Sequence, residues 1–299
     1  MSEQKLPELA ESADSLELAD TVPLALTPSE PAEASATWVL LRGLSRESGH
    51  WGEFPRLLLR KIREQQPGAQ LIMLDLPGNG MLHRQSSPSE VPAMVEACRA
   101  QLARFGVQGP VHVLAMSLGA MVASDWIGRY PSEVCAGVLI NTSLRPFSPF
   151  YRRLRPLNYM TLLMLSLSRL GYRQREAKVL RMTTRLLKQP EEVLDHWVAL
   201  QRERPVGVRN TVRQLLAAAR YEASRRRPAA PILLLCSKAD RLVDWRCSQA
   251  ISRAWGAPLR LHEHAGHDLP LDDGPWVAQA VGDWLKMRRM QGLDHGEWH

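Results

Sequence analysis

The sequence predicts an α/β fold: a mostly parallel sheet covered by helices on both faces, with an inserted block of helices. Short apolar runs of strand type alternate with longer segments whose apolar residues recur at helical spacing, and this alternation is typical of a parallel sheet. It stops over residues 145–230, where only helical patterns occur, and then resumes. The chain has 299 residues, 45% of them hydrophobic, which is enough for a sizeable core.

The alternation before the insertion predicts four strands and three helices. The predicted strands are 38–41, 70–74, 111–115 and 134–140. The predicted helices are 54–65, 89–105 and 118–130. Ser89 is the expected N-cap of the second helix, because it immediately precedes the first residues of the helical pattern.

After the insertion the pattern predicts two strands and two helices. The strands are 232–236 and 259–263, and the helices are 245–255 and 276–290. We therefore divide the chain into three parts. They are an acidic, disordered tail (1–36), a core domain (37–144 and 231–299) and a helical cap (145–230).

The formal net charge is +7, and the charged residues are distributed unevenly along the chain. Residues 1–36 hold one lysine, eight acidic residues and no aromatic residue, a composition typical of disorder. Residues 145–230 hold 19 lysines and arginines and 6 acidic residues. Most of these charges are expected on solvated helical faces, although the basic cap is also a candidate for weak association with an anionic membrane surface. No nucleic-acid-binding motif accompanies them, so we expect no nucleic-acid partner.

The remaining composition narrows the class of protein further. The four cysteines are too few and too scattered for a disulfide framework or a zinc site, and we expect no metal. The first residues lack the apolar stretch of a signal peptide. No run of the sequence approaches the roughly 18 apolar residues that cross a bilayer. These features favour a cytoplasmic protein.

Ser117 is the candidate nucleophile. It stands in Ala115-Met116-Ser117-Leu118-Gly119, where a predicted strand runs without a gap into a helix. Such a turn projects the intervening side chain above the sheet edge, and crowding there requires small residues two positions before and two after it. The hydroxyl would lie at a helix N-terminus, which stabilises an anion. The alternative is a serine that only caps the helix.

His267 and Asp240 are the candidate base and orienting acid. A serine alkoxide is inaccessible near neutral pH without a base, and a neutral histidine is suited to that role. His267 lies in the loop after the last predicted strand, where ligands gather in open α/β sheets; His264 is the alternative. Asp240 is the first acidic residue after strand 232–236.

Two further aspartates follow predicted strands and receive structural roles instead. Asp244 comes one helical turn after the candidate acid and is expected to cap helix 245–255. Asp75 is expected to fix the turn through Pro77-Gly78.

Two backbone N–H groups are the candidate donors to an oxyanion, because acyl transfer develops negative charge on the carbonyl oxygen. Leu118 follows the candidate nucleophile directly. Leu44 follows Gly43 in the loop after the first predicted strand, and the glycine lets the chain turn there. The alternative is an ordinary loop between a strand and a helix.

Taken together, four segments in this order resemble the α/β-hydrolase superfamily, in its esterase, lipase and thioesterase-like group with a helical cap. They are Arg42-Gly43-Leu44, Asp75-Leu76-Pro77-Gly78-Asn79-Gly80, the segment around Ser117, and Ser237-x-x-Asp240-x-x-Val243 followed by Gly266-His267. The resemblance covers about residues 37–290. Two residues depart from the family pattern: Arg42 stands where the family has histidine, and Ala115 replaces the first glycine of the serine segment.

The resemblance implies a serine hydrolase that cleaves a carboxylic ester or thioester, with Ser117, Asp240 and His267 as its triad and no cofactor. Residues 145–230 would cover Ser117. Their apolar run over 160–170 favours either packing between helices or a pocket for an acyl chain. The alternatives are a catalytically inactive binding protein on the same scaffold, and amide or carbon–carbon bond hydrolysis, because a fold does not fix the reaction.

Overall fold

The structure is a computed structural model that describes residues 36–167 and 170–292 of the chain. The acidic segment expected to be a disordered tail lies outside these ranges, except for Ala36. No helix within them is both long and apolar enough to cross a membrane.

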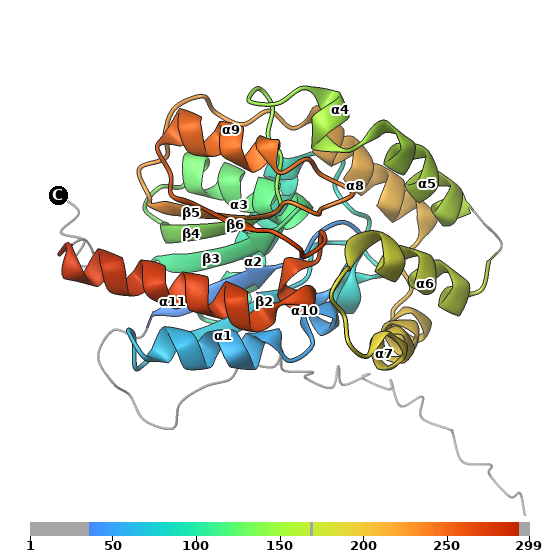
Figure 1. Ribbon diagram of the computed structural model, residues 1–299, viewed down its shortest axis with the longest axis horizontal. Helices are drawn as coiled ribbons and strands as arrows, with labels where there is room; N and C mark the ends of the chain where they lie inside the picture. The colour runs from blue at the N-terminus through green and yellow to red at the C-terminus, as the bar shows by residue number, and fades with distance from the viewer. Residues whose placement is uncertain (1–35, 168–169, 293–299) are drawn as a thin grey trace, which may run out of the picture.

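The described residues form a six-stranded sheet in the order β2-β1-β3-β4-β5-β6, with every neighbouring pair parallel (Figure 1). The strands are β1 (Thr37–Leu41), β2 (Gln70–Leu74), β3 (Val111–Met116), β4 (Val134–Ile140), β5 (Ile232–Ser237) and β6 (Leu259–His262). The predicted strands agree with these bounds to within one residue at each end. The α/β fold class predicted from the sequence is therefore confirmed.

Helices occupy both faces of the sheet and one of its ends. Six of them are α1 (Phe54–Arg63), α2 (Val91–Arg104), α3 (Leu118–Arg129), α9 (Arg246–Trp255), α10 (Leu269–Asp272) and α11 (Gly274–Met290). The others are α4 (Phe150–Arg153), α5 (Pro156–Leu167), α6 (Tyr172–Thr183), α7 (Pro190–Glu203) and α8 (Val208–Arg220). Two short 3₁₀ helices, Ser48–Trp51 and Gly80–Leu82, lie in loops after β1 and β2.

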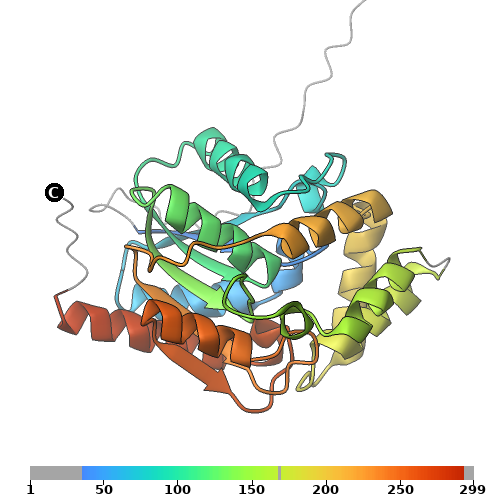
Figure 2. The ribbon, with the colours of Figure 1, turned by 90° about the horizontal axis from the view of Figure 1, so that it is seen from above.

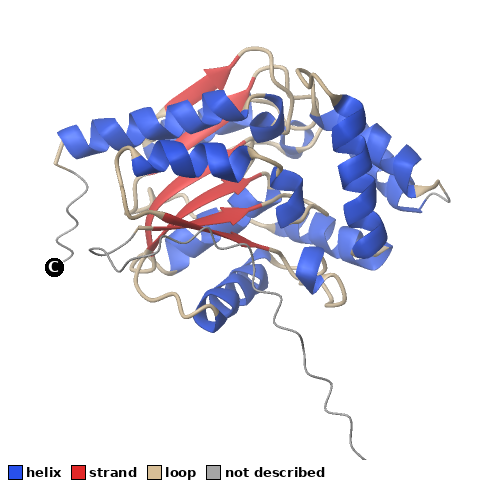
Figure 3. Cartoon of the chain, turned by 90° about the horizontal axis from the view of Figure 1, so that it is seen from below, coloured by secondary structure: helices blue, strands red, loops and turns tan. Residues whose placement is uncertain are grey.

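Alternate side chains of β1 belong to two different hydrophobic cores. Val39 and Leu41 pack with residues of α2, α3 and α9. Trp38 and Leu40 point to the other face, where α1 and α11 cover the sheet (Figure 3). Every residue of β1 is buried, as expected for a parallel strand covered on both faces.

The order of the strands creates a crevice between β1 and β3. From this pair the sheet extends to β2 on one side and to β4 on the other. Open α/β sheets bind ligands at such a switch point, outside the carboxyl ends of the strands. The loops that follow β1 and β3 carry Gly43 and Ser117, so both residues lie at this crevice.

The helices α4–α8 fall between β4 and β5 in the chain, within residues 145–230, where only helical patterns are predicted. Figures 1 and 2 place them beside the carboxyl ends of the strands rather than over a face of the sheet. An isolated bridge between Arg145 and Glu222 joins the two ends of the insertion. The division of the chain into a core and a cap stays a prediction.

Two details differ from the sequence analysis. The helix α2 begins at Val91 after Glu90, so Ser89 is not its N-cap. Pro92 lies in its first turn, where a proline is favoured because its missing N–H needs no partner. The short helix α10 was not predicted, because four residues do not display a helical period.

Candidate active site

Ser117 occupies the sharp turn between β3 and α3. Its φ is +55° and its ψ is −116°, a backbone conformation that costs a non-glycine residue about 1–3 kcal/mol. The N–H of Ser117 donates to the carbonyl of Ile140 at 2.9 Å, and its carbonyl accepts from the Thr142 hydroxyl at 3.2 Å. These bonds to the end of β4 hold the turn in place.

Close packing around this turn explains the small residues beside Ser117. A methyl group built on Gly119 would lie 2.5 Å from the carbonyl oxygen of Arg42 and 2.7 Å from that of Leu41, which is too close for any side chain. Ala115 is fully buried in β3 and pairs with Leu41 in the sheet. The end of β1 therefore sets the size limit at Gly119.

The structure brings His267 and Asp240 together. His267 Nδ1 lies 2.7 Å from Asp240 Oδ2, and both side chains are almost fully buried. The other carboxylate oxygen, Oδ1, accepts from the backbone N–H groups of Leu242 at 2.7 Å and Val243 at 3.1 Å. The aspartate is thus fixed by its own loop and orients the imidazole. With the ring proton on Nδ1, His267 Nε2 is left as an acceptor.

The charge of Asp240 also controls the protonation of His267. Burial has the largest effect and lowers the pKa of His267, and Arg42 lowers it as well. The charge and the hydrogen bond of Asp240, together with the charge of Asp268, raise it and outweigh both. The net result is a pKa above the ordinary value of 6.5, so the ring favours gaining a proton.

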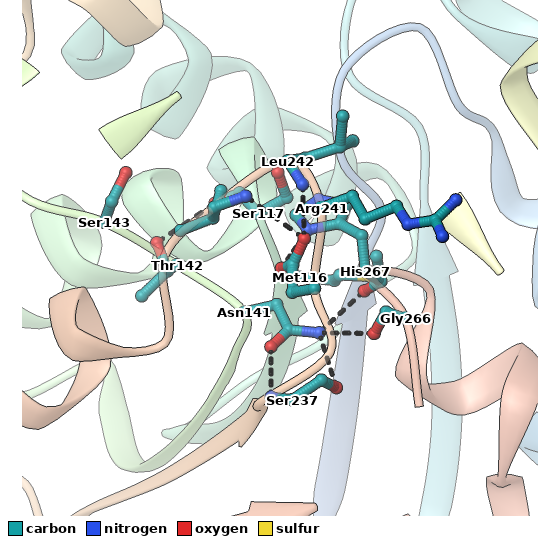
Figure 4. A network of polar contacts seen from close by, with 12 residues as sticks. Met116, Ser117, Asn141, Thr142, Ser143, Ser237, Arg241, Leu242, Gly266 and His267 are labelled. Carbon is teal, nitrogen blue, oxygen red and sulfur yellow. Dashed lines mark hydrogen bonds and ion pairs between the residues drawn. The ribbon is translucent and has the colours of Figure 1, made fainter. Parts of the chain in front are cut away.

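Asn141 supports the histidine loop from the end of β4 (Figure 4). Its Nδ2 donates to the carbonyls of His267 at 2.7 Å and Gly266 at 3.3 Å, and to Ser237 Oγ at 3.2 Å. Its Oδ1 accepts from the N–H of Ser237 at 2.8 Å. One buried amide therefore ties together the loops that follow β4, β5 and β6. The sequence analysis did not identify Asn141; its signal is a polar residue directly after an apolar strand.

Leu44 and Leu118, whose N–H groups are the candidate donors, line the same cavity as Ser117. Leu118 is the first residue of α3, where an N–H has no partner within its helix. The backbone of Gly43 packs on the serine, since a methyl group built there would lie 3.1 Å from Ser117 Cβ. Neither N–H donates a hydrogen bond to any other group in the described ranges. Both can therefore donate to an oxygen bound at Ser117.

A cavity of about 120 Å³ opens beside Ser117. Its apolar walls come largely from the inserted helices and the loop after β5: Leu154, Leu162, Val179, Leu215, Leu242 and Val243. Three arginines also line it, but all are engaged elsewhere, Arg42 by Asp268. Arg46 pairs with Glu176 at 2.6 Å, and Arg153 donates to a carbonyl at the end of α8 at 2.6 Å. The cavity therefore favours an apolar group next to Ser117.

His267 lines the same cavity as Ser117. No hydrogen bond joins the two side chains in the part of the chain that the structure describes. Catalytic hydrogen bonds in enzymes without substrate are often long and tighten only when substrate binds. Ser117 and His267 thus meet at one cavity, and Asp240 is already bonded to the histidine.

Arg42 forms a buried ion pair with Asp268, directly beside His267. Its two terminal nitrogens lie 3.0 and 2.5 Å from the two carboxylate oxygens, and both side chains are 3% exposed. Arg42 thus links the loop after β1 to the loop that carries the histidine. The sequence analysis recognised Arg42 only as a departure from the family pattern and missed Asp268, because nothing local marks such a pair.

The alternative residues lie elsewhere. His264 is exposed and does not line the cavity. Asp244 accepts from the N–H of Arg246 at 2.9 Å, at the start of α9. Asp75 accepts from the N–H groups of Ser48 at 2.7 Å and Met81 at 3.0 Å. Asp75 therefore holds the turn after β2 as expected, whereas the N-cap of α9 is Trp245 and not Asp244.

Two other features of the described ranges bear on ligands. They contain no group of three or more histidine, cysteine or acidic side chains that could hold a metal ion. A larger hollow of about 400 Å³ lies at the opposite end of the strands, against Trp255 and Trp284, and none of the candidate catalytic residues lines it.

This arrangement is typical of the α/β hydrolases: a parallel sheet has a serine at the strained turn after β3 and an aspartate–histidine pair on the loops after β5 and β6. The sequence profile of the alpha/beta hydrolase family matches residues 38–280. The chain belongs to this family, and it is a hydrolase by fold and family.

Individual relatives are more distant. The chain is 27% identical over 228 residues to "Putative carbamate hydrolase RutD" of Cronobacter turicensis, a match that covers 75% of this chain and 80% of the relative. A solved hydrolase from Pseudomonas aeruginosa has a TM-score of 0.69 at 18% identity, covering 89% of this chain and 99% of that one. An esterase from Thermogutta terrifontis has a TM-score of 0.62 at 18% identity, covering 84% and 90%. These structural likenesses support the fold.

Proposed function

We propose that the protein is a serine hydrolase that cleaves a carboxylic ester or thioester of an apolar acyl group through an acyl-enzyme intermediate. The observation that carries the proposal is the 2.7 Å bond between Asp240 and His267 at the cavity that Ser117 also lines. A serine, a histidine and a buried carboxylate in this arrangement have the parts needed for nucleophilic acyl transfer.

In the first half of the reaction, Ser117 Oγ attacks the carbonyl carbon while His267 Nε2 accepts the hydroxyl proton. Asp240 holds the imidazole and stabilises the imidazolium that forms. The N–H groups of Leu44 and Leu118 donate to the tetrahedral oxyanion; losing one such donor typically costs about 10²–10³ in rate. The intermediate collapses as His267 gives its proton to the departing alkoxide or thiolate, which leaves the acyl group on Ser117.

In the second half, water takes the place of the leaving group. His267 accepts a proton from this water, and the resulting hydroxide attacks the acyl carbonyl carbon. Collapse of the second tetrahedral intermediate breaks the bond to Ser117 Oγ, which recovers its proton from His267. The products are the carboxylic acid and the free enzyme.

The apolar walls of the cavity support an apolar acyl group rather than a charged one. The similarity to a protein named as a carbamate hydrolase makes carbamates a second candidate class. A carbamate carbonyl accepts the same attack, so the same three residues would serve both classes. The substrate panel that tests the proposal should therefore contain both.

The test compares the wild-type protein with Ser117→Ala on nitrophenyl esters, acyl thioesters and carbamates. We expect the variant to lose about 10⁴–10⁶ in turnover, and to lose labelling by a fluorophosphonate probe. Ser143→Ala is the matched control, because Ser143 lines the same cavity but donates its hydroxyl to the Arg153 carbonyl at 3.1 Å. It should still label. Full turnover by Ser117→Ala would contradict the mechanism, and a folded wild-type protein that never labels would favour a binding protein instead.

A further inference from the structure

The helix α5 presents apolar side chains on two sides. On its inner side, Leu162 lines the cavity of the candidate active site and Leu165 is buried. On its outer side, Leu157, Met160 and Met164 recur at helical spacing and are 83%, 59% and 60% exposed. Apolar side chains of a helix normally pack against other parts of the protein. An exposed row of this kind marks a surface that meets a partner.

The preceding helix, α4, also carries exposed apolar side chains. Phe150 and Tyr151 of α4 are 69% and 50% exposed, and their rings contact each other edge to face at 5.7 Å. Figure 1 shows α4 and α5 following one another along the outer margin of the molecule, away from the sheet. We call the surface formed by Phe150, Tyr151, Leu157, Met160 and Met164 the α4–α5 edge. Exposed aromatic rings of this kind are enriched where proteins meet membrane headgroups.

The charges around the α4–α5 edge are positive. Residues 145–175 contain no aspartate and no glutamate. Arg152, Arg155 and Arg241 are exposed. The first two lie in or directly after α4, and the carbonyl of Arg241 accepts from Asn158 of α5 at 2.8 Å. The backbone N–H of Asp244 donates to the Arg152 carbonyl at 3.0 Å, so this carboxylate lies close by, but it is already engaged in an ion pair. An apolar row flanked by arginines complements a surface that is apolar inside and anionic outside.

We propose that the α4–α5 edge docks on an anionic lipid bilayer, with its apolar side chains among the acyl chains and its arginines at the lipid phosphates. Apolar insertion and attraction to anionic headgroups together bind interfacial helices, and each arginine near such a surface adds to the binding. The docked helix also roofs the cavity through Leu162. On the proposed function, this places the site next to esters carried by the bilayer; the docking itself does not depend on catalysis.

The test is sedimentation of the full chain with vesicles of phosphatidylglycerol and phosphatidylcholine in equal parts, and with vesicles of phosphatidylcholine alone. We expect binding to the anionic vesicles that weakens as salt is raised, because salt screens the arginines. Ser117→Ala should bind equally well, which separates docking from catalysis. Failure of wild-type protein and Ser117→Ala to bind the anionic vesicles would overturn the proposal, whatever the outcome for ester hydrolysis.

Two groups of variants assign the binding to the α4–α5 edge. The triple change Leu157→Ser, Met160→Ser and Met164→Ser should weaken binding about 30-fold or more, since each half-buried apolar side chain contributes several-fold. The double change Arg152→Glu and Arg241→Glu should weaken it by at least about 30-fold. All these side chains lie outside the catalytic cavity. Circular dichroism and activity on a water-soluble ester should therefore stay at wild-type levels.

Matched controls come from other surfaces. Met290→Ser removes a methionine that is 79% exposed on α11, and Arg104→Glu reverses an exposed charge on α2. Both should bind the vesicles as the wild type does. Equal weakening by these controls would overturn the assignment to the α4–α5 edge. A second outcome would also overturn it: the wild type does not bind vesicles but forms dimers in light scattering, and the triple serine variant stays monomeric. The α4–α5 edge would then be covered by a second copy of the chain.

Discussion

The bonds around Asp240 predict a specific effect of Asp240→Asn. Oδ1 accepts from the N–H groups of Leu242 and Val243 at 2.7 and 3.1 Å, while Oδ2 lies 2.7 Å from His267 Nδ1. Asparagine has a single side-chain oxygen, and the two backbone donors will hold that oxygen in the place of Oδ1. The amide NH₂ then faces His267 and donates to Nδ1. The ring proton must move to Nε2, so the imidazole can no longer accept the proton of Ser117.

The magnitude follows from this tautomer change. In a serine protease triad the same substitution leaves the geometry intact and lowers kcat about 10⁴-fold, and we expect a loss of about 10³–10⁴ here. The pKa of His267 should also fall, because the charge of Asp240 is the largest of the effects that raise it. The assay is the initial rate on an ester that the wild type hydrolyses, measured across the pH range, with circular dichroism as a check on folding.

Asp244→Asn is the matched control, because Asp244 follows the same strand but accepts from the N–H of Arg246 rather than from the histidine. It should keep wild-type rates. A folded Asp240→Asn protein that loses less than about tenfold would refute the reasoning, since His267 would then not depend on the carboxylate.

Three further predictions concern protonation, packing and a buried ion pair. The wild-type kcat/KM should rise with pH through a value above 6.5, because the raised pKa of His267 keeps the base protonated below it; a limb centred below 6.5 would contradict this. The raised pKa of His267 affects folding in the opposite direction. The stability that protonated His267 supplies is fully present below its pKa in the unfolded chain, and it is lost as the pH rises through its pKa in the folded protein. In thermal denaturation, Gly119→Ala should strongly destabilise the protein, because the new Cβ would lie 2.5 Å from a carbonyl oxygen. Gly128→Ala in the same helix has open space and should be neutral or stabilising by up to about 1 kcal/mol. Equal melting temperatures of the two variants would count against the packing argument. In urea unfolding, Arg42→Met should lower the free energy of unfolding by about 3–5 kcal/mol, because it leaves Asp268 buried and unpaired. Adding Asp268→Leu should restore most of that free energy. A loss below about 1 kcal/mol for the single change would show that the pair behaves as a solvated one.

Much of the fold follows from local patterns in the sequence. Short apolar runs predict the strands because both faces of a parallel sheet are covered. The edge strand β6 is the exception, since it alternates apolar and polar residues and leaves Arg260 exposed. Small residues at positions 115 and 119 identify the turn around Ser117, since that crowding is also local. Local signals fail where two of them compete. Ser89 is a good capping residue, but α2 begins two residues later, with Pro92 in its first turn.

The candidate site is predictable only in part, for a physical reason. All six strands are parallel, so the residues that follow β3, β5 and β6 lie at the same edge of the sheet, and Ser117, Asp240 and His267 can be chosen together. The pair between Arg42 and Asp268 joins positions 226 residues apart. Any basic residue in one loop could meet any acidic residue in another, and a single sequence does not say which. Long-range polar pairing therefore needs coordinates.

The positive φ of Ser117 has a consequence for engineering. The bonds to the end of β4 keep this residue in a conformation that a glycine would adopt without penalty, so the hydroxyl is present at the expense of about 1 kcal/mol or more. A selection for heat resistance alone would therefore favour glycine at position 117 and discard the nucleophile. Screens for more stable variants of this protein must therefore select for turnover as well as for folding, since at position 117 stability favours glycine and turnover requires serine.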